Sequence, residues 1–133
     1  MATYSMDWIG DLKFRSGEGE PPIELHSSTT GMLSPMKTLA YAQIACMGMD
    51  VVHVLTRGRH DLKALKVTLD GRRAPEHPRR YVAMTLHFDI TGDVDDALVE
   101  RAIQLSREKY CSVSNSLRED LDFRTTFTIR PEQ

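Results

Sequence analysis

Cys46 and Cys111 are the only two cysteines of this 133-residue chain, and they stand 65 positions apart. A thiolate can attack the O–O bond of a peroxide and become a sulfenic acid, which a second cysteine converts to a disulfide. An external dithiol then reduces that disulfide. The pair therefore indicates two-cysteine redox chemistry, while simple packing of two small core residues is the competing interpretation.

Cys46 lies inside an almost unbroken apolar run, Leu39 to Leu55. An apolar environment raises the pKa of a thiol unless a cation or a hydrogen bond offsets it. Arg15, in a predicted strand–loop region, is a candidate for that cation, and a surface role is its alternative. The apolar surroundings also suit a hydrophobic peroxide; they are Tyr41, Ile44, Met47 and Met49.

Cys111 stands just before a predicted short helix at 112–117. A thiolate is favoured at a helix N-terminus, because the unpaired N–H groups carry partial positive charge there. The alternative is a buried cap residue.

Asp50 and His53 follow Cys46 at i+4 and i+7 on one helix face. Cysteine, aspartate and histidine can all bind zinc. The span from i to i+7 is two turns, about 10.5 Å of rise, which is too long for one ion. We therefore expect no metal site, and expect Asp50 and His53 to pair with strand groups or with a second subunit.

Composition is that of one globular domain over residues 1–133, with 41% hydrophobic and 27% charged residues. The net charge of −2 and the lack of aromatic residues around the basic loop at 70–80 argue against nucleic-acid binding. The first residues lack a signal-peptide layout, and Gln43, Asp50 and His53 interrupt the apolar run. A cytoplasmic protein with no membrane span is expected, in which a permanent disulfide is unusual.

Hydrophobic periodicity predicts strand patches at 8–14 and 23–25 and then a long helix. Ser34 is its expected N-cap, Pro35 its first residue and Gly58 its stop after about Arg57. This helix is apolar nearly all round, so it needs cover on every side. A homodimer that buries it would supply that cover.

The second half predicts strands at 65–69 and 82–90, the latter with clear alternation. Asp93 is the expected cap of a helix that ends near 109–110, and a final strand covers 123–130. Strands, helix, strands, helix and strand in this order make an α+β domain.

Two segments, one around each cysteine, resemble the OsmC/Ohr family of osmotically inducible and organic hydroperoxide resistance proteins. The first runs from Ser34 to Arg59 and contains Ala45-Cys46-Met47-Gly48-Met49-Asp50-Val51-Val52; the second contains Glu108-Lys109-Tyr110-Cys111-Ser112-Val113. The Asp-Val-Val and Glu-Lys-Tyr-Cys-Ser-Val elements are typical of the YhfA-like branch of that family.

The resemblance implies an OsmC-like fold, in which antiparallel strands wrap a long buried central helix within an intertwined homodimer. It also implies reduction of organic hydroperoxides, with Cys46 as the peroxidatic and Cys111 as the resolving cysteine. Arg15 is our candidate for the family's catalytic arginine. The family uses no metal, flavin or haem, and a lipoyl-type dithiol is the expected reductant.

The chain departs from the pattern of active members at the acid that orients the arginine. Met36 stands where they carry a glutamate, and Lys37 stands where the YhfA-like branch commonly has one. A peroxidase is therefore weighed against a non-catalytic OsmC-fold protein that binds a small hydrophobic ligand or senses redox state through Cys46. A third hypothesis gives both cysteines a packing role only.

Overall fold

The computed structural model describes residues 2–27, 29–58 and 60–132, which form two compact units. The units are Met1–Tyr41 and Ala42–Gln133, and the long helix α1 contributes residues to both.

The N-terminal unit holds a small antiparallel sheet of β1 (Met6–Trp8), β2 (Lys13–Ser16) and β3 (Glu24–His26). The strand patches predicted within 8–14 are two strands with different bounds, β1 and β2, because the chain turns between them. Gly10 and Asp11 have φ of 106° and 45°, and the Ile9 N–H donates to the Lys13 carbonyl at 3.0 Å to close the turn. Positive φ values interrupt an extended strand, and Gly and Asp tolerate them better than most residues do.

Helix α1 spans Pro35–Arg57, as predicted, with Gly58 directly after it. The Lys37 N–H donates to Ser34 Oγ at 3.2 Å, which is the expected N-cap bond. Burial is one-sided: Gln43, Met47, Val51 and Leu55 are buried at four-residue spacing. Met49 is 70% exposed, so a single chain does not cover the helix on every side. By length and composition α1 could also cross a bilayer, a test that core helices pass too.

The C-terminal unit is built on a sheet of order β4-β5-β6. Strand β4 (Asp61–Arg73) runs antiparallel to β5 (Tyr81–Asp93), and β6 (Asp122–Arg130) runs parallel to β5. Strands β4 and β5 are both longer than predicted, and their pairing includes the polar residues at 70–73. The alternation on β5 is confirmed, with Met84, Leu86, Phe88 and Ile90 buried on one face.

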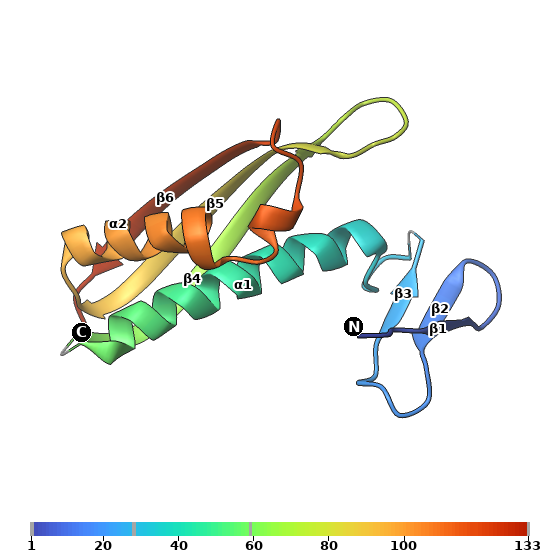
Figure 1. Cartoon of the computed structure of the whole chain (residues 1–133), viewed down its shortest axis with the longest axis horizontal. Helices are drawn as coiled ribbons and strands as arrows, with labels where there is room; N and C mark the ends of the chain where they lie inside the picture. Colours follow the sequence, from blue (N-terminus) through green and yellow to red (C-terminus); the bar gives the residue numbers. More distant parts are fainter. Residues whose placement is uncertain (1, 28, 59, 133) are drawn as a thin grey trace. The chain divides into compact units, whose positions relative to one another are not determined.

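Helix α2 (Asp96–Leu105) and the Ala42–Arg57 part of α1 pack on the sheet of this unit, as Figure 1 shows. Their shared core includes Met47, Val51 and Leu55 from α1 and Val99, Ala102 and Ile103 from α2. The α+β class is thereby confirmed. The predicted cap Asp93 is wrong, because it ends β5. Asp95 is the N-cap, and its carboxylate accepts the Ala97 N–H at 3.4 Å.

The chain after α2 does not continue as an α-helix. It makes one π-helical turn, η1 (Ser106–Tyr110), and then a 3₁₀ turn, η2 (Ser114–Ser116). The predicted helix at 112–117 thus shrinks to three residues, which is too short to supply a helix dipole to Cys111. Any stabilisation of a Cys111 thiolate must therefore come from local hydrogen bonds to its sulfur.

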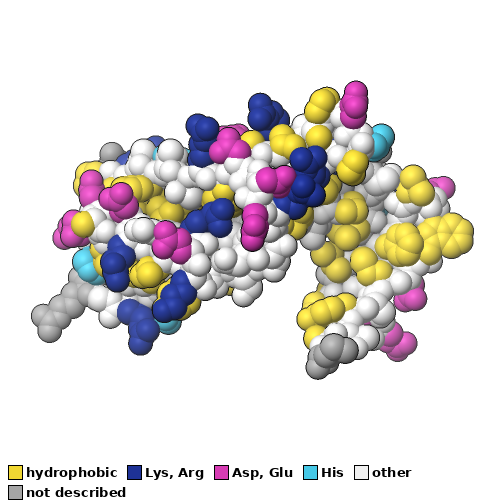
Figure 2. All heavy atoms as spheres, turned by 45° about the horizontal axis from the view of Figure 1, so that its top comes forward, with side chains coloured by type: hydrophobic (Ala, Val, Ile, Leu, Met, Phe, Trp, Pro, Cys, Tyr) yellow, Lys and Arg dark blue, Asp and Glu magenta, His cyan; other side chains and the backbone are white. Residues whose placement is uncertain are grey.

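Large hydrophobic side chains remain on the surface of the N-terminal unit, where Figure 2 shows them gathered. Trp8 is 67% exposed and Leu12 is 71% exposed. A three-stranded sheet of this size cannot bury such side chains by itself. The unit therefore presents an apolar surface in the single chain.

Candidate functional site

The structure brings the two cysteines together. Cys46 comes from the middle of α1 and Cys111 directly follows η1, and the two thiols are close enough for each to shift the pKa of the other. Cys111 is 0% exposed, whereas Cys46 is only partly buried, and both are free thiols. One sulfur can therefore meet a solute and the other can act only through the first.

The π-helical turn places Cys111 against α1. The Cys111 N–H donates to the Ser106 carbonyl at 2.7 Å, which is the i to i−5 bond that defines such a turn. Ser106 Oγ in turn donates to Asp50 Oδ2 on α1 at 2.7 Å, and Ser106 is fully buried. The π-helical turn is thus hydrogen-bonded to α1 through Ser106 at its start. The buried Cys111 follows directly after its last residue.

The chain after Cys111 folds back so that its N–H groups face the sulfurs. The Ser114 N–H donates to Cys111 Sγ at 3.3 Å, and the N–H groups of Val113 and Ser112 act on the Cys46 sulfur. Asn115 Nδ2 fixes the turn by donating to the Cys111 carbonyl at 2.8 Å. Successive N–H groups that converge in this way stabilise negative charge.

The two thiols have opposite pKa shifts. Burial raises the pKa of Cys46, and although the Val113 N–H lowers it in part, the adjacent Cys111 sulfur raises it further. Burial also acts to raise the pKa of Cys111, but hydrogen bonds from Ser114, Cys46 and Gln43 outweigh it and bring that pKa below its usual range. When the pair of thiols loses its first proton, the negative charge resides mainly on the Cys111 sulfur.

Gln43 belongs to this site and was not identified from the sequence as a functional residue. It is fully buried, and its Nε2 donates to Cys111 Sγ at 3.5 Å. Its position three residues before Cys46 on a helix was the available signal, because residues at i and i+3 share a face.

Arg15 lies on β2, and its Nε contacts Glu24 Oε1 on β3 at 3.0 Å. The two residues are direct cross-strand partners. The Arg15 hydrogen bond, joined by one from His26, lowers the pKa of the Glu24 carboxyl. The sequence analysis looked for an acid that contacts an arginine next to Pro35, whereas the acid in contact with Arg15 is Glu24 on the neighbouring strand, which a prediction of the strand register would have identified.

Asp50 and His53 do not join Cys46 in a metal site. Asp50 pairs with Ser106 on the helical side of the unit, not with a strand group as expected. Within the ranges 2–27, 29–58 and 60–132, no group of three His, Cys, Asp or Glu side chains is arranged to hold a metal ion. Asp50, His53 and Arg57 instead line a hollow of about 500 Å³ beside Ser106 and Tyr110.

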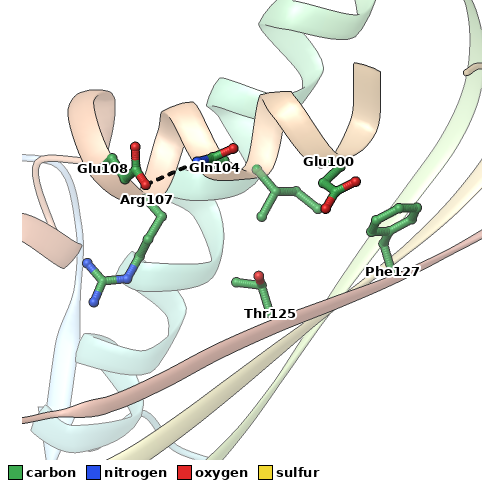
Figure 3. Close-up of a pocket in the computed structure, with 7 residues that line it drawn as sticks. Glu100, Gln104, Arg107, Glu108, Thr125 and Phe127 are labelled. Carbon is green, nitrogen blue, oxygen red and sulfur yellow. Dashed lines mark hydrogen bonds between the residues drawn. The ribbon is translucent and has the colours of Figure 1, made fainter. Parts of the chain in front are cut away.

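Another hollow, of about 390 Å³, opens between β6 and the α2–η1 segment and is drawn in Figure 3. Gln104 Nε2 donates to Glu108 Oε1 at 3.2 Å on the helical side. The guanidinium of Arg107 lies 4.3 Å from the centre of the Phe123 ring. Neither cysteine lines this hollow, so it is separate from the thiol pair.

Comparison with known proteins shows which family this chain is similar to. Residues 28–126 match the model of the family described as "OsmC-like protein". The chain is 35% identical to "Protein YhfA" of Escherichia coli K12 over 125 residues, which cover 92% of this chain and 93% of YhfA.

Solved structures share the fold over the whole length. A hypothetical protein from Aquifex aeolicus VF5 has a TM-score of 0.90 at 26% identity, covering 100% of this chain and 98% of that one. The organic hydroperoxide resistance protein OsmC of Legionella pneumophila has a TM-score of 0.73 at 18% identity, with 96% and 98% covered. The expected OsmC-like fold is therefore confirmed.

Ultraviolet titration of thiolate absorbance will show which sulfur carries the charge. In Cys46→Ser we expect a thiolate step below the usual cysteine pKa of 9.0, because Ser114 and Gln43 still donate to Cys111. In Cys111→Ser that early step should be absent. An early step that survives in Cys111→Ser and disappears in Cys46→Ser would place the charge on Cys46 instead.

Proposed function

Given that this chain belongs to the OsmC family, we propose that it is a thiol-dependent peroxidase that reduces organic hydroperoxides through Cys46 and Cys111. One observation carries the proposal: the two thiols are close enough for each to shift the pKa of the other, and one is partly exposed while the other is fully buried. Such a pair can receive an oxidant at one sulfur and resolve the product with the other. The solved relatives from Legionella and other bacteria that are named for organic hydroperoxide resistance support the substrate class.

The first step starts from a Cys46 thiol and a Cys111 thiolate. The proton passes from Cys46 to Cys111, and the Cys46 thiolate attacks the terminal oxygen of ROOH, breaking the O–O bond. The alkoxide RO⁻ takes the proton back from Cys111 and leaves as ROH. The products are a Cys46 sulfenic acid and a Cys111 thiolate, so charge and atoms balance.

The second step forms the disulfide. The Cys111 thiolate attacks the Cys46 sulfur, an S–S bond forms, and the hydroxide that leaves takes a proton from solvent. Because Cys111 is buried directly beside Cys46, its sulfur is already next to the sulfur that it attacks. The pair has then given two electrons to the peroxide.

A dithiol of the lipoyl type is the proposed reductant. Its thiolate attacks Cys46, because that sulfur is the exposed one, and Cys111 leaves as a thiolate. A leaving thiol with a lowered pKa departs faster, and the pKa of Cys111 is lowered by the Ser114 and Gln43 hydrogen bonds, against the effect of burial. The second thiol of the reductant then displaces Cys46 and closes its own disulfide.

Arg15 is the proposed cation of the site, and Glu24 is the acid that orients it. The Arg15–Glu24 contact of 3.0 Å supports this proposal, because it gives the arginine an acidic partner although none follows Pro35. Exposed ion pairs stabilise a fold little, so the value of this pair lies in fixing the direction of the guanidinium. A fixed cation favours the Cys46 thiolate and the developing alkoxide.

A homodimer is the proposed assembly, in the cytoplasmic location that we also propose. A groove of about 580 Å³ runs along α1 beside β4, and it is lined mainly by apolar side chains. The exposed apolar side chains of the N-terminal unit, such as Trp8 and Leu12, need cover as well. A second copy of the chain would cover both surfaces.

A redox sensor is the second candidate, and the raised pKa of Cys46 is the observation that favours it. A smaller thiolate fraction slows attack on peroxide. A sensor would form the same disulfide but would show no sustained turnover with a dithiol.

Replacing each cysteine in turn tests its proposed role, peroxidatic for Cys46 and resolving for Cys111. Cys46→Ser should lower steady-state reduction of cumene hydroperoxide by a lipoyl-type dithiol at least about a thousandfold, because the nucleophile is lost. Cys111→Ser should consume about one equivalent of peroxide and then stop with these dithiols. Turnover is followed by loss of peroxide, and normal turnover in Cys46→Ser would refute the proposed function.

Variants of the ion pair test the role of Arg15. Arg15→Met should lower kcat/KM by about 10²-fold or more, the usual cost of removing one charge-stabilising donor. Glu24→Gln should cost roughly tenfold, because it loosens the arginine without removing it. Arg118→Met is the matched control, since it breaks a similar exposed pair with Asp120. Equal, small losses in Arg15→Met and Arg118→Met would exclude the role.

Sedimentation equilibrium tests the assembly. The expected mass is twice the 15.1 kDa of the chain. Met49→Lys should shift the equilibrium toward the monomer, because it would bury a charge in the apolar surface along α1. A wild-type protein that sediments as a monomer at all concentrations would contradict the homodimer.

A further inference from the structure

Of the two polar atoms in the Gln43 side-chain amide, only Nε2 forms a hydrogen bond with the thiol pair. Its side chain is 0% exposed, and Nε2 donates to Cys111 Sγ at 3.5 Å. Oε1, at the other end of the same amide, is buried and has no hydrogen-bond partner among the residues that the structure describes. An unpaired acceptor therefore lies beside two sulfurs.

Such an acceptor is unusual in a folded protein. Most buried polar atoms are paired, and an unpaired one costs free energy or waits for a ligand. The planar amide keeps Oε1 close to the sulfur pair while Nε2 holds Cys111. Gln43 and Cys46 lie at i and i+3, so the amide with the open acceptor is on the same side of α1 as the reacting thiol.

We propose that Gln43 orients the substrate: Oε1 accepts the hydroxyl hydrogen of the hydroperoxide oxygen that Cys46 attacks. This inference rests on the proposed peroxidase function. The bond survives the chemical step, because the same oxygen and hydrogen become the Cys46 sulfenic acid when RO⁻ leaves. Gln43 thus acts at both ends of its amide, with Nε2 on the Cys111 thiolate and Oε1 on the substrate.

A hydrogen-bond acceptor at Oε1 predicts a preference for substrates that carry an O–H hydrogen on the attacked atom. A hydroperoxide carries an O–H hydrogen on the attacked oxygen, whereas an aromatic disulfide that oxidises thiols carries none. Both reagents require the same Cys46 thiolate. The ratio of their rates therefore isolates the hydrogen bond to Oε1 from any change in thiolate formation.

The test compares cumene hydroperoxide with 4,4′-dithiodipyridine in single-turnover oxidation of reduced protein, quenched and followed by intact mass. Gln43→Met keeps the side-chain volume but has neither donor nor acceptor. It should lower the ratio of the hydroperoxide rate to the disulfide rate by roughly fivefold to tenfold. Its urea midpoint should equal or exceed that of the wild type, because an unpaired buried oxygen is removed.

Gln43→Glu supplies the matched rescue. It retains an acceptor oxygen and loses the N–H donor, so both absolute rates can change while their ratio stays near the wild-type value. Gln104→Met, which removes an amide on α2 away from the thiol pair, should leave both rates unchanged.

The outcomes are distinct. An unchanged ratio in Gln43→Met would overturn the assignment, while peroxidase function would stand. A lowered ratio in both Gln43→Met and Gln43→Glu would also overturn it. Wild-type protein that reacts with the disulfide but not with the hydroperoxide would overturn the inference together with the proposed function.

Discussion

The attachment of the Cys111 turn to helix α1 is the constraint on which the site depends. Ser106 Oγ donates to Asp50 Oδ2 at 2.7 Å, and the Ser106 carbonyl accepts the Cys111 N–H at 2.7 Å. A hydrogen bond to a charged group contributes about 1.5–3 kcal/mol. Through these two bonds one buried serine fixes both the π-helical turn and the cysteine after it. Loss of the attachment would separate the sulfurs and move the Ser114 N–H away from Cys111.

The attachment explains why the two thiols differ in chemical character. Cys111 is surrounded by donors and isolated from solvent, which suits a stored thiolate and a good leaving group. Cys46 is reachable but holds its proton more tightly, since burial and the neighbouring Cys111 both raise its pKa. Reactivity toward a peroxide then requires proton transfer within the pair.

Local patterns in the sequence predicted the elements that depend on local interactions. The cap at Ser34, the helix from Pro35 to Arg57 and the alternation of β5 follow from residue type and spacing. What the sequence could not predict depends on contacts between distant residues. The bounds of β1 and β2 are set by their pairing with each other, and the π-helical turn is stabilised by Asp50 from another helix.

The same distinction applies to the site. The motifs around Cys46 and Cys111 identified both sulfurs, but no pattern on one element shows that they touch. Glu24 and Gln43 were missed because each acts on a residue elsewhere in the chain, Arg15 across a strand pair and Cys111 across 68 positions. Predicting such partners requires the register of strands and the packing of helices.

Peptide mapping of reduced protein titrated with cumene hydroperoxide is the most direct measurement of whether Cys46 and Cys111 form one redox pair. Close contact between the sulfurs predicts a stoichiometric Cys46–Cys111 disulfide that a dithiol reverses. Thiols that stay reduced under excess peroxide, or a Cys46 that is overoxidised while Cys111 remains free, would contradict a two-cysteine mechanism.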